Sequence, residues 1–264
     1  MKVIYEPAGK AREYSELAVN LYTGCSHNCV VCYALQMNRR YGRDPKPIPR
    51  KNILELIKKD AIEMEKTHDD RQILLCFMTD PYQEIEDELK ITSQTIDVLM
   101  QHNLRFTILT KGGLRSIPDM DKYEKYSKAS YGVTLNTLND NTRKKYEPDA
   151  ACIDDRIQAL RNAHEKGIKT WVSVEPVYDA NEALYMINEV NSLVDIFKVG
   201  KLNHFPEIEK NVDWKRFGTL AVELLERLNK KYYIKEDLRK FIPNVKINNF
   251  VINASDKSQK TLFS

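Results

Sequence analysis

Three cysteines, Cys25, Cys29 and Cys32, lie within one short run, Cys-Ser-His-Asn-Cys-Val-Val-Cys. Thiolates are soft ligands that favour zinc, copper(I) or iron–sulfur clusters. Three thiolates cannot complete a four-coordinate site, so the fourth position must be open or taken by a group that is not a cysteine. An open position is typical of a site that performs chemistry rather than one that only stabilises the fold.

The spacing Cys-x3-Cys-x2-Cys helps to choose among these metals. Zinc sites usually pair two Cys-x2-Cys halves or combine cysteine with histidine, and no second half follows in this chain. A cubane 4Fe–4S cluster normally takes four thiolates, so three would leave one iron free to bind a small molecule. We favour this open cluster. The alternatives are a zinc site completed by His27 or a distant histidine, and structural cysteines that cluster by chance.

The elements that must position these cysteines can be predicted from the apolar pattern. Six strands are predicted at Leu17–Tyr22, Ile73–Met78, Phe106–Leu109, Tyr131–Leu135, Thr170–Val174 and Asp195–Val199. Helical patterns lie near residues 51–66, 90–102, 115–127, 154–167, 180–193 and 214–229. Strands separated by helices indicate βαβ units and a parallel sheet. We therefore predict an α/β fold, an incomplete (β/α)6 TIM-type barrel.

Polar residues follow these strands where each strand ends. In barrels of this kind the site lies at the C-terminal ends of the strands. The cysteines lie in the loop after the first strand, and the other candidates should meet them at the same rim. These candidates are Thr79 and Asp80, Thr110 and Lys111, Asn136, Glu175, and Lys201.

The domain organisation follows from length and composition. The chain has 264 residues, 42% of them hydrophobic, which is enough for one large α/β domain. We predict a barrel over residues 1–231 and a short C-terminal appendage over residues 232–264. In the appendage we expect a strand at 232–234, a helix at 235–241, a weak strand at 246–252 and frayed last residues.

Composition also bounds the cellular setting and the partners. The N-terminus lacks the apolar core of a signal peptide, and no stretch approaches the roughly 18–20 apolar residues of a membrane span. The cysteine count is odd, and three of the five cysteines lie in one cluster, which argues against a disulfide framework. We therefore expect a reducing, cytoplasmic setting. The net charge of +3 permits a nucleic-acid partner but does not argue strongly for one.

Several stretches carry a resemblance to a known family. They are Tyr22–Cys29, Thr79–Glu86, Leu109–Lys111, Val133–Leu138 and Tyr146–Pro148, with Arg156 downstream. With the cysteine spacing, they resemble the radical S-adenosylmethionine (SAM) superfamily. Within it they are most similar to the subgroup of spore photoproduct lyase and the so-called DNA repair photolyases. The resemblance covers roughly residues 20–180.

The resemblance implies a 4Fe–4S cluster whose free iron is chelated by the amino and carboxylate groups of SAM. One electron cleaves the sulfonium, and the resulting 5′-deoxyadenosyl radical abstracts a hydrogen atom from a buried substrate. The electron would come from a donor such as a flavodoxin or a ferredoxin. The enzyme would be of the lyase or transferase type. Nucleic acid is the substrate that the subgroup suggests, with a peptide or a small metabolite as alternatives.

The resemblance also assigns roles to the residues at the rim. The three cysteines are the cluster ligands. Thr79 and Asp80 approach the SAM amino group, with a charge-assisted hydrogen bond from the ammonium to the carboxylate. The structural alternative for Asp80 is a turn before Pro81. Lys111 pairs with the SAM carboxylate, or else it is a solvated loop lysine.

Further contacts are expected from the fourth and fifth strands. Thr134 and Asn136 lie two residues apart, hence on one face of a strand, and they resemble contacts to the ribose and methionine of SAM. Glu175 would accept a hydrogen bond from a ribose hydroxyl or bind substrate. Its structural alternative is a salt bridge to Arg156 or to a neighbouring lysine.

Three further positions complete the candidate site. Tyr33 follows the last cysteine and is expected near the adenine, although the family usually carries an aromatic residue where this chain has Val31. Core packing is the alternative for Tyr33. Lys201 and His204 follow the sixth strand near the expected substrate mouth, where His204 could move protons or make a structural hydrogen bond.

Two cysteines remain outside the motif. Spore photoproduct lyase uses a cysteine as hydrogen donor three residues before an aspartate, but Cys76 stands four residues before Asp80. A shift of one residue turns a strand side chain to the opposite face, and Phe77 occupies the donor position instead. The full lyase mechanism is therefore not expected to transfer. Cys152 is expected to be an inert thiol.

A rival function comes from a different class. The cysteines could hold a metal or an iron–sulfur cluster in a non-catalytic module, such as a redox sensor or a nucleic-acid binder. The two functions differ in iron content and in whether reduction cleaves SAM.

Overall fold

Seven strands form one sheet whose spatial order follows the chain from β1 to β7. The computed structural model describes residues 2–42 and 46–248. The strands are β1 (Leu17–Val19), β2 (Ile73–Leu75), β3 (Phe106–Thr110), β4 (Ala129–Thr134), β5 (Lys169–Val174), β6 (Ile196–Val199) and β7 (Lys231–Ile234). All neighbouring strands are parallel, so every connection must cross over the sheet.

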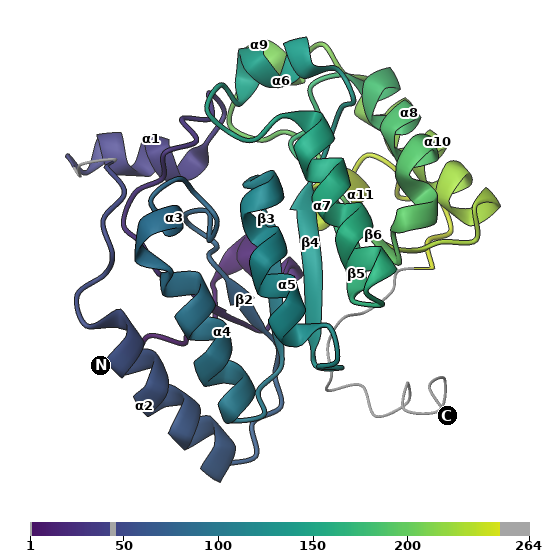
Figure 1. Cartoon of the computed structure of the whole chain (residues 1–264). Helices are drawn as coiled ribbons and strands as arrows, with labels where there is room; N and C mark the ends of the chain where they lie inside the picture. Colours follow the sequence, from purple (N-terminus) through teal and green to yellow (C-terminus); the bar gives the residue numbers. More distant parts are fainter. Residues whose placement is uncertain (1, 43–45, 249–264) are drawn as a thin grey trace.

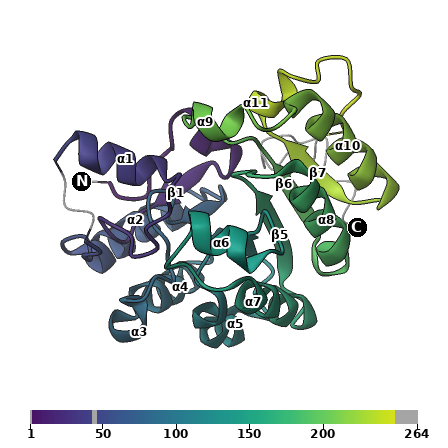
Figure 2. The ribbon, with the colours of Figure 1, turned by 90° about the horizontal axis from the view of Figure 1, so that it is seen from above.

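The connecting helices lie on the outside of this curved sheet (Figures 1 and 2). The longer ones are α2 (Ile53–Lys66), α4 (Ile91–Gln101), α5 (Ile117–Tyr123), α7 (Ile153–Glu165), α8 (Ala180–Val190) and α10 (Trp214–Arg227). The shorter ones are α1 (Tyr33–Arg40), α3 (Glu86–Leu89), α6 (Asp140–Tyr146), α9 (Pro206–Glu209) and α11 (Glu236–Arg239), with 3-10 turns η1 (Gly9–Glu13), η2 (Gly113–Ser116) and η3 (Asn191–Leu193). In Figure 1, α1, α6 and α9 gather at one end of the sheet. Among the described residues, no helix has the length and apolar character that crossing a bilayer requires.

Alternation along the strands separates an outer core from the lumen of the barrel. Ile73 and Leu75 belong to the large core under the helices, whereas Leu74 between them belongs to a smaller cluster with Trp171. The indole Nε1 of Trp171 donates to Thr107 Oγ1 at 2.9 Å. A Cβ added to Gly132 would lie 2.2 Å from Trp171 Cε2, so this large ring fits only over a glycine.

The N-terminal residues connect the first and last strands of the open sheet. Tyr5 forms an antiparallel bridge with Ala18 of β1. Glu13 reaches the other edge, where its Oε1 accepts hydrogen bonds from Tyr233 Oη at 3.1 Å and from the backbone N–H of Glu236 at 2.8 Å. The segment that precedes β1 therefore contacts both edges of the barrel.

The structure confirms the predicted incomplete α/β barrel, with one correction to the strand count. Each of the six predicted strands is present, and β7 makes a seventh because it pairs with β6 over four residue pairs. Its residues, Lys231–Ile234, straddle the expected boundary at residue 231, so the sheet continues into the segment expected as an appendage. The wider division of the chain at this point stays a prediction.

The remaining differences concern short elements. The sequence pattern did not predict α1 or α6. Helix α1 comes after β1 and α6 comes after β4, at the rim of the barrel. A helix was expected at 235–241 and is present as α11. Of the strand expected at 246–252, residues 246–248 are not in a strand and the rest lie outside the described residues, as do the last residues expected to fray.

Candidate active site

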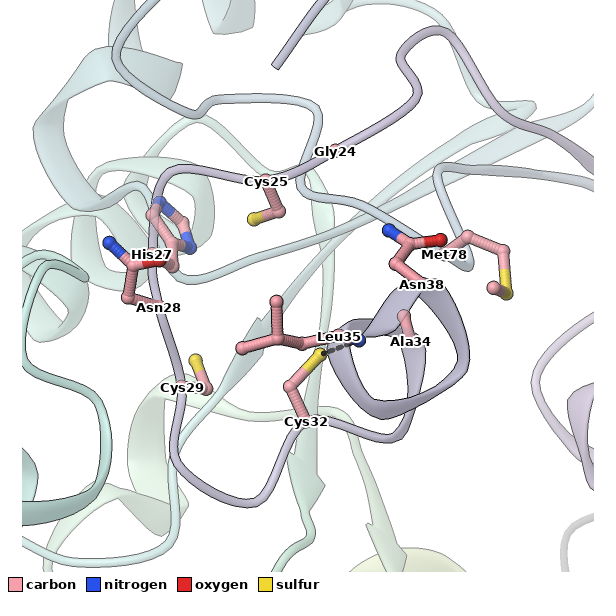
Figure 3. A pocket seen from close by; sticks show the side chains of 10 residues that line it. All are labelled: Gly24, Cys25, His27, Asn28, Cys29, Cys32, Ala34, Leu35, Asn38 and Met78. Atoms are coloured by element: carbon pink, nitrogen blue, oxygen red, sulfur yellow. Dashed lines mark hydrogen bonds between the residues drawn. The ribbon is translucent and has the colours of Figure 1, made fainter. Parts of the chain in front are cut away.

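The three cysteines of the loop after β1 line a single pocket. Figure 3 shows their sulfur atoms turned toward a shared space beside Leu35 of α1. All three thiols are free and half-buried. The pocket holds about 340 Å³ of empty space, part of it open to solvent. Its other lining residues are Gly24, His27, Asn28, Ala34, Leu35, Asn38 and Met78.

Local hydrogen bonds give the cysteine loop its shape. Gln83, in the loop after β2, accepts from Ser26 N at 2.9 Å and donates to the carbonyl of Gly24 at 3.3 Å. Cys32 is the N-cap of α1, and its Sγ accepts from the backbone N–H of Leu35 at 3.4 Å.

The arrangement of the thiols bears on the metal centre that they could hold. Within residues 2–42 and 46–248, no three His, Cys, Asp or Glu side chains converge where a single ion would contact them all. Mononuclear zinc requires that convergence, because each sulfur lies about 2.3 Å from the ion. A cubane cluster does not, because each thiolate binds a different iron. The three thiols around one pocket therefore fit a 4Fe–4S cluster.

Burial keeps two of these thiols protonated in the metal-free chain. It raises the pKa of Cys25 to about 12 and that of Cys29 to about 11. Because iron binds the thiolate, ligation by either residue must release a proton. Cys25 and Cys29 therefore do not provide preformed anions, and a nearby cation would help to stabilise the ligated state.

Lys111 supplies such a cation beside Cys29. Its Nζ lies 3.7 Å from Cys29 Sγ and 2.8 Å from Glu147 Oε1, and the side chain is 16% exposed, so it is not a solvated loop lysine. Glu147 is 1% exposed, and its Oε2 lies 2.6 Å from Nη1 of the fully buried Arg156. Burial opposes ionisation of Glu147, but Lys111 and Arg156 lower its pKa to about 2. Glu147 is thus ionised at neutral pH and holds Lys111 against a cluster-ligand candidate.

Asp80 makes the turn that was the structural alternative for it. Its Oδ1 accepts from the backbone N–H of Tyr82 at 2.8 Å and from Thr110 Oγ1 at 2.6 Å. Its Oδ2 accepts from the backbone N–H of Lys111 at 2.7 Å. The carboxylate thereby joins the ends of β2 and β3 and fixes the start of the Lys111 loop. Beside it, Thr79 Oγ1 is buried and has no hydrogen-bond partner within the described part of the chain.

His27 lines the pocket and also lacks a full set of hydrogen-bond partners. Its Nδ1 lies 3.6 Å from Asp80 Oδ2, and its Nε2 is buried and unpaired among the residues that the structure describes. Burial lowers the pKa of His27, so the ring is neutral at physiological pH. A neutral ring in this position can make one further hydrogen bond to a group in the pocket.

The structure places Thr134 and Asn136 at the same rim, at and just beyond the end of β4, and both are buried. Asn136 Nδ2 donates to the carbonyl of Pro176 at 2.6 Å, and the Thr134 carbonyl accepts from Arg156 at 3.2 Å. Neither side chain lines the cysteine pocket itself. Their assignment to SAM stays a prediction.

Tyr33 begins α1 and is not among the residues that line the cysteine pocket. Its hydroxyl donates to Met78 Sδ at 2.6 Å, and its ring centroid lies 5.8 Å from that of Phe77. The ring centroid of Phe77 is in turn 5.9 Å from that of Tyr14, and Tyr14 belongs to the residues around the lumen. Tyr33 therefore packs among aromatic rings, and its expected proximity to adenine stays a prediction.

Glu175 has the neighbouring lysine that was its structural alternative. Lys235, which directly follows β7, forms an ion pair with Glu175 Oε2, and Tyr14 Oη donates to the same oxygen at 2.9 Å. The alternative partner Arg156 is bound to Glu147 instead. Lys198 of β6 lies nearby in the lumen, where it donates to the Tyr14 carbonyl at 2.6 Å. Burial lowers its pKa well below the usual range.

The two predicted substrate residues do not lie in the cysteine pocket. Lys201 Nζ is 2.7 Å from Glu209 Oε2 and also donates to the carbonyl of Leu202, so it is engaged within its own loop. His204 is exposed and has a positive φ of 70°. The loop carries both side chains away from the thiols, and their role toward substrate stays a prediction.

Both leftover cysteines also lie outside the pocket. Cys76 is buried in the core after β2, and burial raises its pKa to about 12. Cys152 is the N-cap of α7, where its Sγ accepts from the backbone N–H of Asp155 at 3.4 Å. A capping role explains this position without redox chemistry.

Sequence reasoning gave no site role to Glu147, Tyr14 or Lys235. A signal existed for Lys235, because it follows a strand directly, as the other rim candidates do. That signal was lost when β7 was assigned to an appendage. Glu147 directly follows the short helix α6, and Tyr14 lies in the segment before β1. In neither place does a periodic pattern predict contact with a distant residue.

Known proteins are similar to this chain in sequence. The sequence model of the radical SAM superfamily matches residues 19–182 of this chain. An uncharacterised protein of Methanocaldococcus jannaschii is 28% identical over 193 residues, which cover 72% of this chain and 71% of that protein. A radical SAM Nalpha-GlyT isomerase of Pseudomonas phage M6 is 27% identical over 157 residues, 58% of this chain but only 30% of the isomerase.

Among solved structures, a spore photoproduct lyase mutant with bound AdoMet and dinucleoside spore photoproduct has a similar fold. The TM-score is 0.68 at 16% identity, and the match covers 86% of this chain and 78% of the lyase. The superfamily match spans more than half of the chain and includes the cysteine loop, β2 to β5 and the loops that directly follow these strands. The chain therefore belongs to the radical SAM superfamily, whose cofactors are a 4Fe–4S cluster and SAM.

Proposed function

We propose that this protein reductively cleaves SAM at a 4Fe–4S cluster held by Cys25, Cys29 and Cys32, and that it abstracts hydrogen from a nucleic-acid component. The observation that carries the proposal is the single pocket lined by three free thiols at the rim of the barrel. The chemistry supplied by a bound cluster is one-electron cleavage of SAM to a 5′-deoxyadenosyl radical. The electron comes from a flavodoxin or a ferredoxin.

The residues around the pocket position and shield the reactants. Glu147 holds Lys111 beside Cys29, which leaves this ammonium as the cation for the SAM carboxylate. Asp80 also fixes the backbone of Lys111 through Oδ2, and its carboxylate has acceptor capacity left for the SAM ammonium. The further SAM contacts in this proposal are Tyr33, Thr79, Asp80, Thr134, Asn136 and Glu175.

A cluster of aromatic rings in the lumen is the feature that we relate to a nucleic-acid substrate. Tyr14 and Trp171 lie 6.2 Å apart between ring centroids, and Phe77 adjoins Tyr14. Nucleic-acid bases that are not paired in a duplex are commonly bound by stacking on such rings. The structural likeness to a lyase with a bound dinucleoside photoproduct supports the same substrate class. Lys201 and His204 are proposed to contact the rest of the substrate outside the lumen.

Anaerobic reconstitution tests the chemistry. The wild-type chain should bind about four irons, show the visible absorbance of an iron–sulfur cluster, and release 5′-deoxyadenosine from SAM with dithionite. Cys29→Ala should lose the cluster and the product. Cys152→Ser is the matched control, because it changes a cysteine outside the pocket and should retain both.

A stoichiometric zinc ion without SAM cleavage would instead support the non-catalytic module. The substrate class is tested separately with short single-stranded oligonucleotides. Oligonucleotide binding that weakens with salt, together with a higher rate of 5′-deoxyadenosine release, would support a nucleic-acid substrate. An unchanged rate at saturating oligonucleotide would contradict it.

A further inference from the structure

The surface over α1 and beside the cysteine loop combines exposed apolar and basic side chains. Its apolar members, Val30, Met37 and Ile48, are 53%, 38% and 48% exposed. Its basic members are Arg39, Arg40 and Lys46. We call this the α1 surface. The apolar members belong to the cysteine loop, to α1 and to the segment after it, and exposed apolar side chains close to a site are candidates for an interaction surface.

The charge of this region is one-sided, whereas the chain as a whole is nearly balanced. Residues 17–54 contain six basic side chains and one carboxylate, Asp44. The whole chain has 41 basic and 38 acidic residues. A carboxylate, Asp149, stands at the border, where it accepts a hydrogen bond from Asn28 Nδ2 at 2.7 Å. The α1 surface therefore presents a positive potential to an approaching partner.

The α1 surface lies directly behind the cysteine pocket. Ala34, Leu35 and Asn38 of α1 line that pocket, and Arg39 and Arg40 of the same helix are exposed. The loop after α1 returns to the cysteines, because the Ile48 carbonyl accepts from the backbone N–H of Thr23 at 3.0 Å. Figures 1 and 2 show α1 at the outer margin of the molecule. A partner on α1 would thus be near the pocket without entering the lumen.

We propose that the α1 surface docks an acidic one-electron carrier protein of the flavodoxin or ferredoxin class. This inference rests on the proposed function, because it assigns the donor that the function requires. The reduced carrier loses one electron and the bound cluster gains it, with no proton or group transferred. Electron transfer slows steeply with distance, which favours a surface separated from the pocket by one helix. Opposite charge speeds the encounter, and the apolar side chains bind the partner after it.

The same charge could attract nucleic acid, but the side chains favour a protein. Proteins that bind single-stranded nucleic acid combine a positive groove with aromatic rings on which successive bases stack. Val30, Met37 and Ile48 are aliphatic, and Tyr41 is the one strongly exposed aromatic ring within residues 17–42 and 46–54. The lumen, where hydrogen abstraction must occur, lies on the other side of α1.

The test uses the reconstituted holoenzyme with two sources of electrons. Arg39→Glu/Arg40→Glu should lower kcat/KM for reduced flavodoxin about tenfold or more, because charge at an interface mainly changes the association rate. The dithionite-driven rate should be unchanged. Lys58→Glu/Lys59→Glu in α2 is the matched control, since it makes the same change of charge on another exposed helix.

A second pair of variants tests the apolar part. Met37→Gln should weaken binding of fluorescently labelled flavodoxin, measured by anisotropy, whereas Leu220→Gln on α10 should not. This readout does not require SAM cleavage. If dithionite yields no 5′-deoxyadenosine from the wild-type protein, the proposed function fails while the docking measurement still decides this inference.

Three results would overturn the docking site. The first is an equal loss of flavodoxin-driven rate in both charge-reversed proteins. The second is no loss in Arg39→Glu/Arg40→Glu. The third is loss of single-stranded DNA binding in that variant with carrier binding intact, which would assign the α1 surface to nucleic acid.

Discussion

Replacement of Glu147 by glutamine removes the charge that holds two buried cations, and a large loss of stability should follow. Glu147 is 1% exposed, lies 2.8 Å from Lys111 Nζ and 2.6 Å from Arg156 Nη1, and glutamine preserves its volume. Breaking a buried ion pair on one side costs about 3–5 kcal/mol, because the other charge is left uncompensated. The lowering of the Glu147 pKa from 4.5 to about 2 gives a similar figure, about 3 kcal/mol.

Guanidinium unfolding of the metal-free, reduced protein, followed by circular dichroism, measures this loss. Glu147→Gln should lower the free energy of unfolding by about 3 kcal/mol and the melting temperature by about 10 °C. Adding Arg156→Met should recover part of the loss, since it removes one stranded cation. Glu207→Gln, at an 86% exposed side chain paired with Lys210, is the control and should leave stability unchanged within error.

The pH dependence of the free energy of unfolding is a second, independent test of the charge on Glu147. The folded-state pKa of Glu147 is lowered, so its stabilisation is complete above its unfolded value of 4.5 and is lost as the pH falls toward about 2. The stability difference between wild type and Glu147→Gln should therefore shrink as the pH falls below about 4.5. A loss under about 1 kcal/mol at neutral pH, or a difference that grows on acidification, would refute the assigned ion pairs.

Three further substitutions test other parts of the fold. Gly132→Ala should destabilise the barrel by about 1–3 kcal/mol or more, because its Cβ would lie 2.2 Å from Trp171 Cε2, and thermal melting would detect it. Lys235→Met should cost about 3 kcal/mol in chemical unfolding, because Glu175 is left without its cation; an unchanged midpoint would argue against this pair. Asp60→Ala should speed hydrogen exchange at the N–H groups of residues 3 and 4, which donate to its Oδ2 at 2.6 and 2.9 Å, while amides of β4 stay protected.

Much of the architecture could be predicted because the signals are local. Short apolar runs at Ile73–Leu75 and Ile196–Val199 alternate with helical patterns, and this alternation specifies a parallel barrel. The rim rule then places Asp80, Lys111 and Glu175 at the same end as the cysteines, and the structure agrees. Helix α6 was missed although Asn139 supplies an N-cap, since its polar sequence has no apolar stripe.

The sequence by itself determined the cysteine spacing, the order of strands and helices, and the family to which the chain belongs, because each depends on residues close together in the chain. Only the tertiary structure decided which charges meet. Lys111 binds Glu147 rather than standing in solvent, and Glu175 binds Lys235, which is 60 residues away. Such pairs depend on how strands and loops curve around a common lumen, and no local pattern records that geometry.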